Sequence, residues 1–160
     1  MKEHKPMKTP IRFLFTLLCA AIVSLPSIHA ATTYTVQDTG DGAANAANCP
    51  GSGCRLRDAL AKVVDNDTIT FSVTTPATIT LNSGQLEISK SITVSGPGAN
   101  QLTVNGNGAS RVLYVDLGLT VTISGLTITN GNAGDDNGGG IYNNDANPDG
   151  EQQHFERQLG

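Results

Sequence analysis

The chain has 160 residues, in which ten Lys and Arg stand against fourteen Asp and Glu and aromatic residues make up 4%. This length suits a single domain. The acidic balance excludes nucleic acid and anionic membrane surfaces as expected partners, because both are bound through basic side chains that neutralise phosphates.

The first 30 residues have the layout of a secretory signal peptide. Three lysines and Arg12 precede the apolar run FLFTLLCAAIVSL at residues 13–25, and small residues follow at Ala30 and Ala31. A membrane anchor is the alternative, but a spanning helix needs about 20 apolar residues. We therefore predict a signal peptide at residues 1–30 and export to the cell surface, the outer membrane or the medium. The mature chain, with six positive and thirteen negative side chains, is predicted to have no transmembrane segment.

The mature chain has two cysteines, Cys49 and Cys54, in the segment CPGSGC. An exported chain meets an oxidising compartment, where such a pair forms a structural disulfide. Zinc binding is a weaker alternative because no His or second cysteine pair lies nearby. A redox-active pair is also weaker, since the spacing is not Cys-x-x-Cys. We predict that a Cys49–Cys54 disulfide closes a small loop.

Residues 31–66 are predicted to form an N-terminal cap. The segment TTYTVQ alternates like a short strand, and a loop rich in Gly, Asn and Asp follows it. CRLRDALAKVV, residues 54–64, predicts a short amphipathic helix because its apolar residues recur at i, i+4, i+7 and i+8. The charged residues Arg57, Asp58 and Lys62 are expected to face away from the apolar side. The predicted apolar face of the cap helix consists of Leu56, Leu60, Val63 and Val64.

From Thr68 to Thr129 the sequence consists of short β-branched segments bounded by turn residues. SITVSG at 91–96 returns as TVTISG at 120–125, and LTVNG at 102–106 returns as LTITNG within 126–131. Such self-similarity is typical of a solenoid, a coil of stacked repeats in which alternate residues point inward. Asn and Gly at the corners tolerate the left-handed backbone of sharp turns. The predicted inward rows contain Ile92, Val94, Leu102, Val104, Val121, Ile123, Leu126 and Ile128.

A Greek-key sandwich is the alternative that turn spacing alone leaves open. The repeated segments and the scarcity of aromatic residues favour the coil. The first turn of a coil exposes aliphatic side chains and strand edges, so we predict that the amphipathic helix covers it.

CRLRDALAKV resembles the Cys-Ser-Leu-Arg-Glu-Ala motif of the CSLREA domain, found near the start of many secreted bacterial proteins. Cys54, Leu56, Arg57 and Ala59 match the motif, Arg55 stands in place of Ser, and Asp58 stands in place of Glu. TITLNSGQLEISKSITVSGPGA, VTISGLTITNGNA and GGGIYN are similar to later segments of those proteins and of polymorphic outer-membrane-protein-like repeats. Over about residues 33–144, the resemblance implies an all-β, right-handed parallel β-helix with an N-terminal cap. It implies rungs at residues 67–144 and supplies no catalytic residue.

The closing residues 145–160 have a different composition, and we predict that they are disordered. Relatives of this type continue with another rung after such a GGGIYNN segment, whereas this chain continues DANPDGEQQHFERQLG. Shifted by one nucleotide, consecutive Gln and His codons specify Asn or Ser, so we interpret the tail as a rung read out of frame. A genuine tail is the alternative.

No set of residues predicts catalysis. The acidic and basic candidates for a polysaccharide-active site are Asp116, Asp135, Asp136 and Arg111. We favour the alternative that they are solvated turn residues. Asp38 and Asp41 in DTGDG offer oxygen ligands that Ca²⁺ accepts, but the downstream Glu of an EF-hand is absent. All three histidines fall in the signal peptide or the tail, which leaves the predicted folded part without a histidine base.

The sequence therefore predicts an exported, non-enzymatic, surface or adhesin-like protein, present as an N-terminal fragment, with surface glycans or other cell-surface proteins as partners. We expect no cofactor, with weakly bound calcium as the open alternative. A truncated polysaccharide lyase or hydrolase with a β-helix fold is the second hypothesis. A decayed gene product without function is the third.

Overall fold

The computed structural model describes Met1, residues 29–136 and residues 138–144. The predicted signal peptide lies almost entirely outside these residues, and so does the predicted disordered tail. The N-terminal part contains β1 (Thr33–Val36), the 3₁₀ helix η1 (Ala46–Asn48) and α1 (Leu56–Leu60). Nine strands follow: β2 (Thr68–Phe71), β3 (Ala77–Thr80), β4 (Leu86–Ile88), β5 (Thr93–Ser95), β6 (Leu102–Asn105), β7 (Leu113–Val115), β8 (Thr122–Ser124), β9 (Thr127–Thr129) and β10 (Ile141–Asn143).

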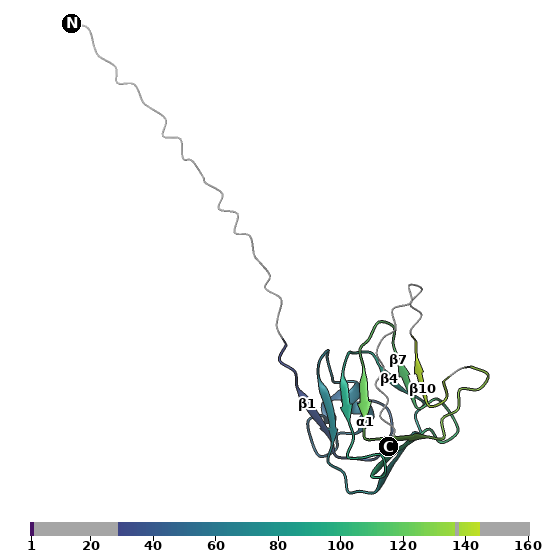
Figure 1. Cartoon of the computed structure of the whole chain (residues 1–160). Helices are drawn as coiled ribbons and strands as arrows, with labels where there is room; N and C mark the ends of the chain where they lie inside the picture. The colour runs from purple at the N-terminus through teal and green to yellow at the C-terminus, as the bar shows by residue number, and fades with distance from the viewer. Residues whose placement is uncertain (2–28, 137, 145–160) are drawn as a thin grey trace.

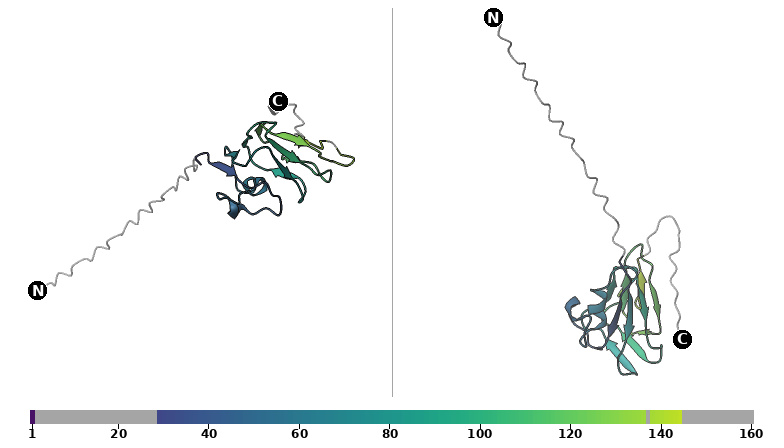
Figure 2. Two further views of the ribbon diagram at one scale, coloured as in Figure 1. Left: turned by 90° about the horizontal axis from the view of Figure 1, so that it is seen from below. Right: turned by 90° about the vertical axis from the view of Figure 1, so that its left-hand side faces the viewer.

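The strands form three parallel sheets with the orders β1-β2-β5-β8, β3-β6-β9 and β4-β7-β10. After β1, the chain visits these sheets in the same order three times. We call β2–β4 the first pass, β5–β7 the second pass and β8–β10 the third pass (Figures 1 and 2). Every strand pair among the described residues is parallel, so the alternative of an antiparallel Greek-key sandwich is wrong.

The segments that resemble one another in sequence are neighbours in the sheets. Thr93 of SITVSG pairs with Thr122 of TVTISG, and Thr103 of LTVNG pairs with Thr127 of LTITNG. Similar short segments therefore stack in register, which brings each aliphatic residue onto its counterpart in the next pass.

These stacked aliphatic rows form the core between the sheets. One row contains Ile69, Val94 and Ile123. A second row contains Ile79, Val104 and Ile128. Seven of the eight predicted inward residues are buried, and Ile128, in the third pass, is half-buried against the core. Since each buried Val, Leu or Ile contributes about 1.5–3 kcal/mol, these rows supply most of the driving force for folding.

Two corners show why Gly and Asn occupy the turns. Gly125 has φ 64° and Asn130 has φ 52°, the left-handed backbone that side chains other than Gly and Asn rarely adopt. Gly96 and Gly125 belong to consecutive passes, and a Cβ atom on either one would collide with the carbonyl group of the other. The corner residues are thus selected both by backbone angle and by the close approach of neighbouring passes.

The helix is shorter than the sequence pattern predicts. It covers Leu56–Leu60 instead of residues 54–64, and Ala61 closes it. Turns follow, and at Asn66 the backbone reaches φ 72°. The sequence pattern predicts neither the strand β10 at residues 141–143 nor the 3₁₀ helix η1 at residues 46–48.

Candidate functional site: the N-terminal cap

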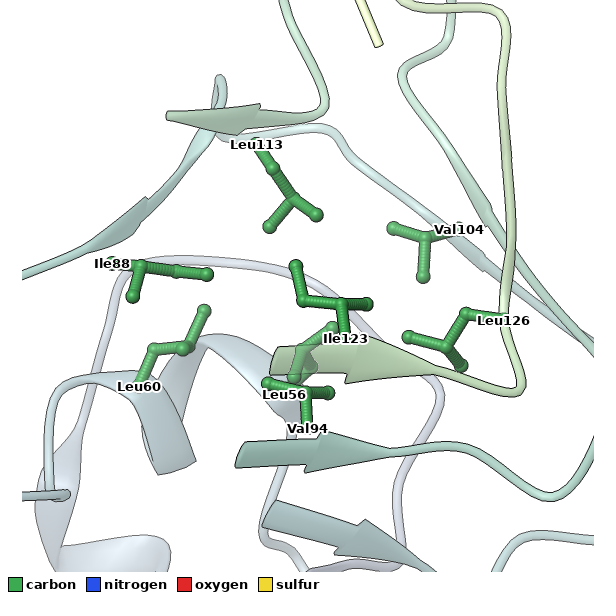
Figure 3. Close-up of a pocket in the computed structure, with 8 residues that line it drawn as sticks. All are labelled: Leu56, Leu60, Ile88, Val94, Val104, Leu113, Ile123 and Leu126. Atoms are coloured by element: carbon green, nitrogen blue, oxygen red, sulfur yellow. The ribbon is translucent and has the colours of Figure 1, made fainter. Parts of the chain in front are cut away.

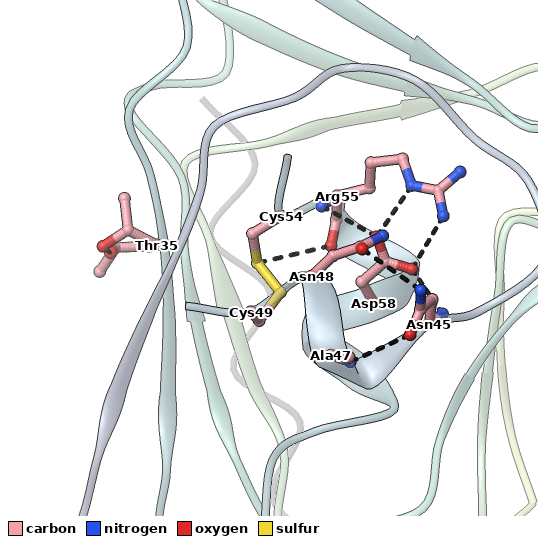
Figure 4. The surroundings of a disulfide bond; sticks show 9 residues. Thr35, Asn45, Ala47, Asn48, Cys49, Cys54, Arg55 and Asp58 are labelled. Carbon is pink, nitrogen blue, oxygen red and sulfur yellow. Dashed lines mark hydrogen bonds and ion pairs between the residues drawn. A yellow bond between two sulfur atoms is a disulfide. The ribbon is translucent and has the colours of Figure 1, made fainter. Parts of the chain in front are cut away.

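The cap consists of β1, the loop to residue 55 and α1, and the Cys49–Cys54 disulfide closes its loop (Figure 4). Both cysteines are buried, at 2% and 0% exposure. The backbone N–H groups of Gln37 and Asp38 donate to the Cys54 carbonyl, at 2.9 and 3.2 Å. The disulfide loop is therefore joined directly to the end of β1.

Asp58 is the polar centre of the cap. Its carboxylate accepts hydrogen bonds from the Asn45 backbone N–H at 2.7 Å, from Asn48 Nδ2 at 2.9 Å and from Arg55 Nε at 2.8 Å (Figure 4). The Arg55 backbone N–H and Nη2 also donate to it. Burial alone raises the pKa of the Asp58 carboxyl, but these donors outweigh it and the pKa lies below its usual value. Asp58 thus joins η1, the loop and α1 as an ionised, fully hydrogen-bonded group.

Asp58 faces the polar loop before the helix, and its side chain is shielded from solvent at 0% exposure. The helix has only five residues, so its first turn lies against the preceding loop and does not present a polar face to solvent. The Arg-x-x-Asp spacing of residues 55–58 and the asparagines upstream are the sequence signals that indicate this contact.

Arg57 connects the cap to the first pass. Its Nε and Nη2 donate to the two carboxylate oxygens of Asp41 at 2.7 and 3.1 Å, and its Nη1 and Nη2 donate to the Gln85 and Gly84 carbonyls, both at 2.7 Å. Asp41 in turn accepts from two backbone N–H groups in the turn before β4, those of residues 82 and 83, at 2.8 and 2.9 Å. Burial raises the pKa of Asp41, but these hydrogen bonds and the Arg57 charge bring it below its usual value. The carboxylate that the sequence offered as a calcium ligand therefore holds the cap to the first pass.

A third buried carboxylate, that of Asp67, connects the residue before β1 to the turn after α1. Asp67, at 0% exposure, accepts from the backbone N–H groups of Thr32 at 2.7 Å and Val64 at 2.8 Å. Burial raises its pKa, yet the hydrogen bonds lower it below the usual value. His29 Nε2 also lies 3.4 Å from Asp67 Oδ1. The two backbone donors belong to the predicted mature chain, whereas His29 would leave with the signal peptide.

The apolar side of the cap packs on the aliphatic rows. Leu56 and Leu60 point into the interior beside Ile88, Val94 and Ile123 (Figure 3). The space between them is a fully apolar cavity of about 10 Å³, too small and too apolar to hold a ligand. The helix therefore fills the interior instead of opening it.

Three of the four residues predicted for the apolar face are buried: Leu56 at 3%, Leu60 at 8% and Val63 at 5% exposure. The fourth, Val64, is 38% exposed, and its assignment to the face is wrong. Helical periodicity ends at Leu60, so the i+8 position no longer returns to the buried side. The backbone N–H of Val64 instead donates a hydrogen bond to the Asp67 carboxylate.

The structure does not gather the acidic candidates into one site. Arg111 Nη2 lies 2.9 Å from Asp136 Oδ2, and its guanidinium stands 5.0 Å from the ring centroid of Tyr142. Asp38 accepts from the Gly40 N–H within its own turn. Among the described residues no group of three or more His, Cys, Asp or Glu side chains could hold a metal ion.

Within the same residues, no helix has the length and apolar character needed to cross a membrane. Comparison with known family models, with curated proteins and with solved structures finds no match for the chain.

Proposed function

We propose that this chain is the capped beginning of an exported, right-handed parallel β-helix, and that it acts at the cell surface as a non-enzymatic, adhesin-like protein. The observation that carries the proposal is the repeated order of its strands. Three passes visit the same three parallel sheets in the same order, each in register with the pass before it. Each pass then corresponds to one rung.

The hand of the coil follows from a general rule. Connections between parallel strands are right-handed in about 98% of cases, because right-handed strand twist favours that crossover. A stack of such rungs has two open ends, and each exposes aliphatic side chains and strand edges. The cap, with Leu56 and Leu60 on the interior rows, suits the role of closing the first end.

Export is supported by the basic and apolar start of the chain and by the buried Cys49–Cys54 pair. Disulfides persist in oxidising compartments, which exported proteins enter. A long, rigid coil that presents repeated surface to solvent suits contact with surface glycans or with other cell-surface proteins. The carboxylates of Asp41, Asp58 and Asp67 accept hydrogen bonds from donors within the fold, which supports a structural role for them.

The export part is tested by expressing the full chain with a C-terminal tag in a Gram-negative host and fractionating the cells. We expect a processed product outside the cytoplasm that begins at Ala31, determined by mass spectrometry. A matched variant with Leu17→Arg and Leu18→Arg should remain unprocessed in the cytoplasm. Equal cytoplasmic retention of both chains would contradict export.

The binding part is tested on the same purified product. An array of surface glycans and a set of acidic polysaccharides with calcium distinguish the two functional hypotheses. Retention on one glycan class without new reducing ends or unsaturated products supports the adhesin-like function. Product formation would overturn it in favour of a polysaccharide-active enzyme.

A further inference from the structure

We propose that the outer face of the β1-β2-β5-β8 sheet binds ice, through a two-dimensional array of threonine and serine hydroxyls. The inference goes beyond the proposed function, since it concerns a different surface from the cap and requires neither export nor glycan binding.

The array follows from the strand register. The outward residues pair across the four strands in two columns, and every member of both columns is Thr or Ser. None of the eight is buried. The first column is Thr33, Thr68, Thr93 and Thr122, and the second is Thr35, Thr70, Ser95 and Ser124.

The spacing of the hydroxyls is regular in both directions. Neighbouring strands of a sheet lie about 4.8 Å apart, and residues i and i+2 of one strand lie about 6.6 Å apart. The four strands run side by side from β1 to β8 (Figure 1), so the array extends over roughly 14 Å across the sheet. The primary prism face of hexagonal ice presents oxygen atoms on a rectangular net. Its short repeat is close to the strand spacing, and its long repeat is slightly greater than the spacing within a strand.

The array is held in place before any ligand arrives. Threonine is branched at Cβ, which restricts its χ1 angle in a strand. Thr35 Oγ1 and Thr70 Oγ1 lie 3.1 Å apart and share a hydrogen bond along the second column. A surface that is already ordered loses little conformational entropy when it meets an ordered lattice. Each hydroxyl offers one donor and two acceptor positions, and water in ice requires both kinds of partner.

The other outward faces provide a comparison within the same fold. In the β4-β7-β10 sheet the corresponding outward column is Glu87, Tyr114 and Tyr142, a charged and aromatic row. In the β3-β6-β9 sheet Asn105 interrupts one column between Thr80 and Thr129. Strands favour threonine in general, but among the sheets of the described residues only β1-β2-β5-β8 has Thr or Ser at every paired outward position.

The chemistry of this face selects the ligand. None of the eight side chains is ionisable, so the face offers no charge to a phosphate, a carboxylate or a cation. An uncharged array with regular spacing in two directions is complementary to a periodic solid and not to a single small molecule. Ice is such a solid, and each of its water molecules both donates and accepts hydrogen bonds.

The experiment uses the purified full chain, whether or not it is exported. It measures thermal hysteresis and identifies the crystal face that the fluorescently labelled protein stains on a growing ice hemisphere. We expect hysteresis with staining of prism faces. Thr93→Lys, in the middle of the array, should lower hysteresis at least tenfold. The matched variant Glu87→Lys, on the outer face of the β4-β7-β10 sheet, should leave it unchanged.

Several outcomes would overturn the proposal. The first is that the native chain shows no hysteresis and does not stain ice. The second is that Thr93→Lys and Glu87→Lys lose hysteresis equally. The third is that hysteresis is lost only in Thr103→Lys, on the β3-β6-β9 sheet. Binding of the native chain to insoluble crystalline polysaccharide without ice activity would also overturn it and identify another solid as the ligand. Circular dichroism confirms that each variant is folded, and if Thr93→Lys does not fold, the native hemisphere assay decides alone. Glycan retention is measured separately, so failure here and failure of the proposed function are distinguishable.

Discussion

At the scale of single residues, the cap depends on buried carboxylates whose partners come from distant parts of the chain. Asp58 accepts hydrogen bonds from residues 10 and 13 positions upstream, and Asp41 accepts from residues 41 and 42 positions downstream. A carboxylate can serve so many donors because each oxygen accepts more than one hydrogen bond. Asp58 thus connects α1 to η1, and Arg57 with Asp41 connects α1 to the first pass.

The first prediction concerns Asp58. Asp58→Ala removes the acceptor of the Asn45 backbone N–H and of Asn48 Nδ2, and leaves Arg55 with the Ala43 carbonyl. An unsatisfied buried group costs about 1–3 kcal/mol. We expect the free energy of unfolding, measured with urea, to fall by about 2–3 kcal/mol. Asp135→Ala, at an exposed turn, is the control and should change it by less than about 0.5 kcal/mol. Equal values for the two variants would show that the Asp58 cluster does not stabilise the fold.

The second prediction concerns pH. The pKa values of Asp41, Asp58 and Asp67 all lie below the ordinary aspartate value of 3.8, so near that pH the unfolded chain binds more protons than the folded chain. The stability from these groups is fully present above about pH 4 and is lost as the pH falls through their folded-state pKa values. We expect the melting temperature to fall steeply below about pH 4. Asp58→Asn should flatten this dependence, and an unchanged profile would contradict the assignment.

At the scale of elements, the disulfide holds a loop that has almost no regular structure of its own. Between β1 and α1 the only regular element in the described residues is η1, with three residues. The loop depends on cross-links because it cannot bury enough apolar surface to order itself.

The third prediction concerns that disulfide. Closing a loop of this size stabilises a fold by about 2 kcal/mol in the chain-entropy model. Cys49→Ser with Cys54→Ser should lower the free energy of unfolding by about that amount. Reduction of the native chain with dithiothreitol should lower the urea midpoint equally, whereas the double variant should not respond to the reductant. A native midpoint that is insensitive to reduction would contradict a stabilising role.

The fourth prediction tests the corrected apolar face of the cap. Leu60→Ala removes a side chain that is 8% exposed and enlarges a cavity between α1 and the rows, so it should cost about 2–5 kcal/mol. Val64→Ala removes a side chain that is 38% exposed and should cost less than about 1 kcal/mol. Urea unfolding of both variants gives the comparison. A larger loss in Val64→Ala would restore the face that the sequence pattern predicts.

At the scale of the whole molecule, the strands were predictable and the cap was only partly so. Short β-branched segments bounded by turn residues predict nine of the ten strands in the described part of the chain, because each pass repeats the same local pattern. The sequence also predicts that SITVSG and TVTISG lie together, since in-register stacking places similar residues in one row. The roles of Asp58 and Asp41 were not predictable, because their partners are set by how the loop folds back and not by any local period. The strand β10 was missed because GGGIYN is too short to show alternation.

The last prediction concerns how stability is distributed along the stack. In the described residues β5, β6 and β7 have a neighbour on both sides, whereas β8, β9 and β10 have a neighbour on one side only. Backbone groups at an edge open more easily, so hydrogen exchange followed by mass spectrometry should show slower exchange in the second pass than in the third. Residues 93–95 against 122–124 are the matched pair, since both segments lie in one sheet with the same outward and inward pattern. Equal protection of the two segments would mean that a further strand, from this chain or from a second copy, pairs with the edge of the third pass.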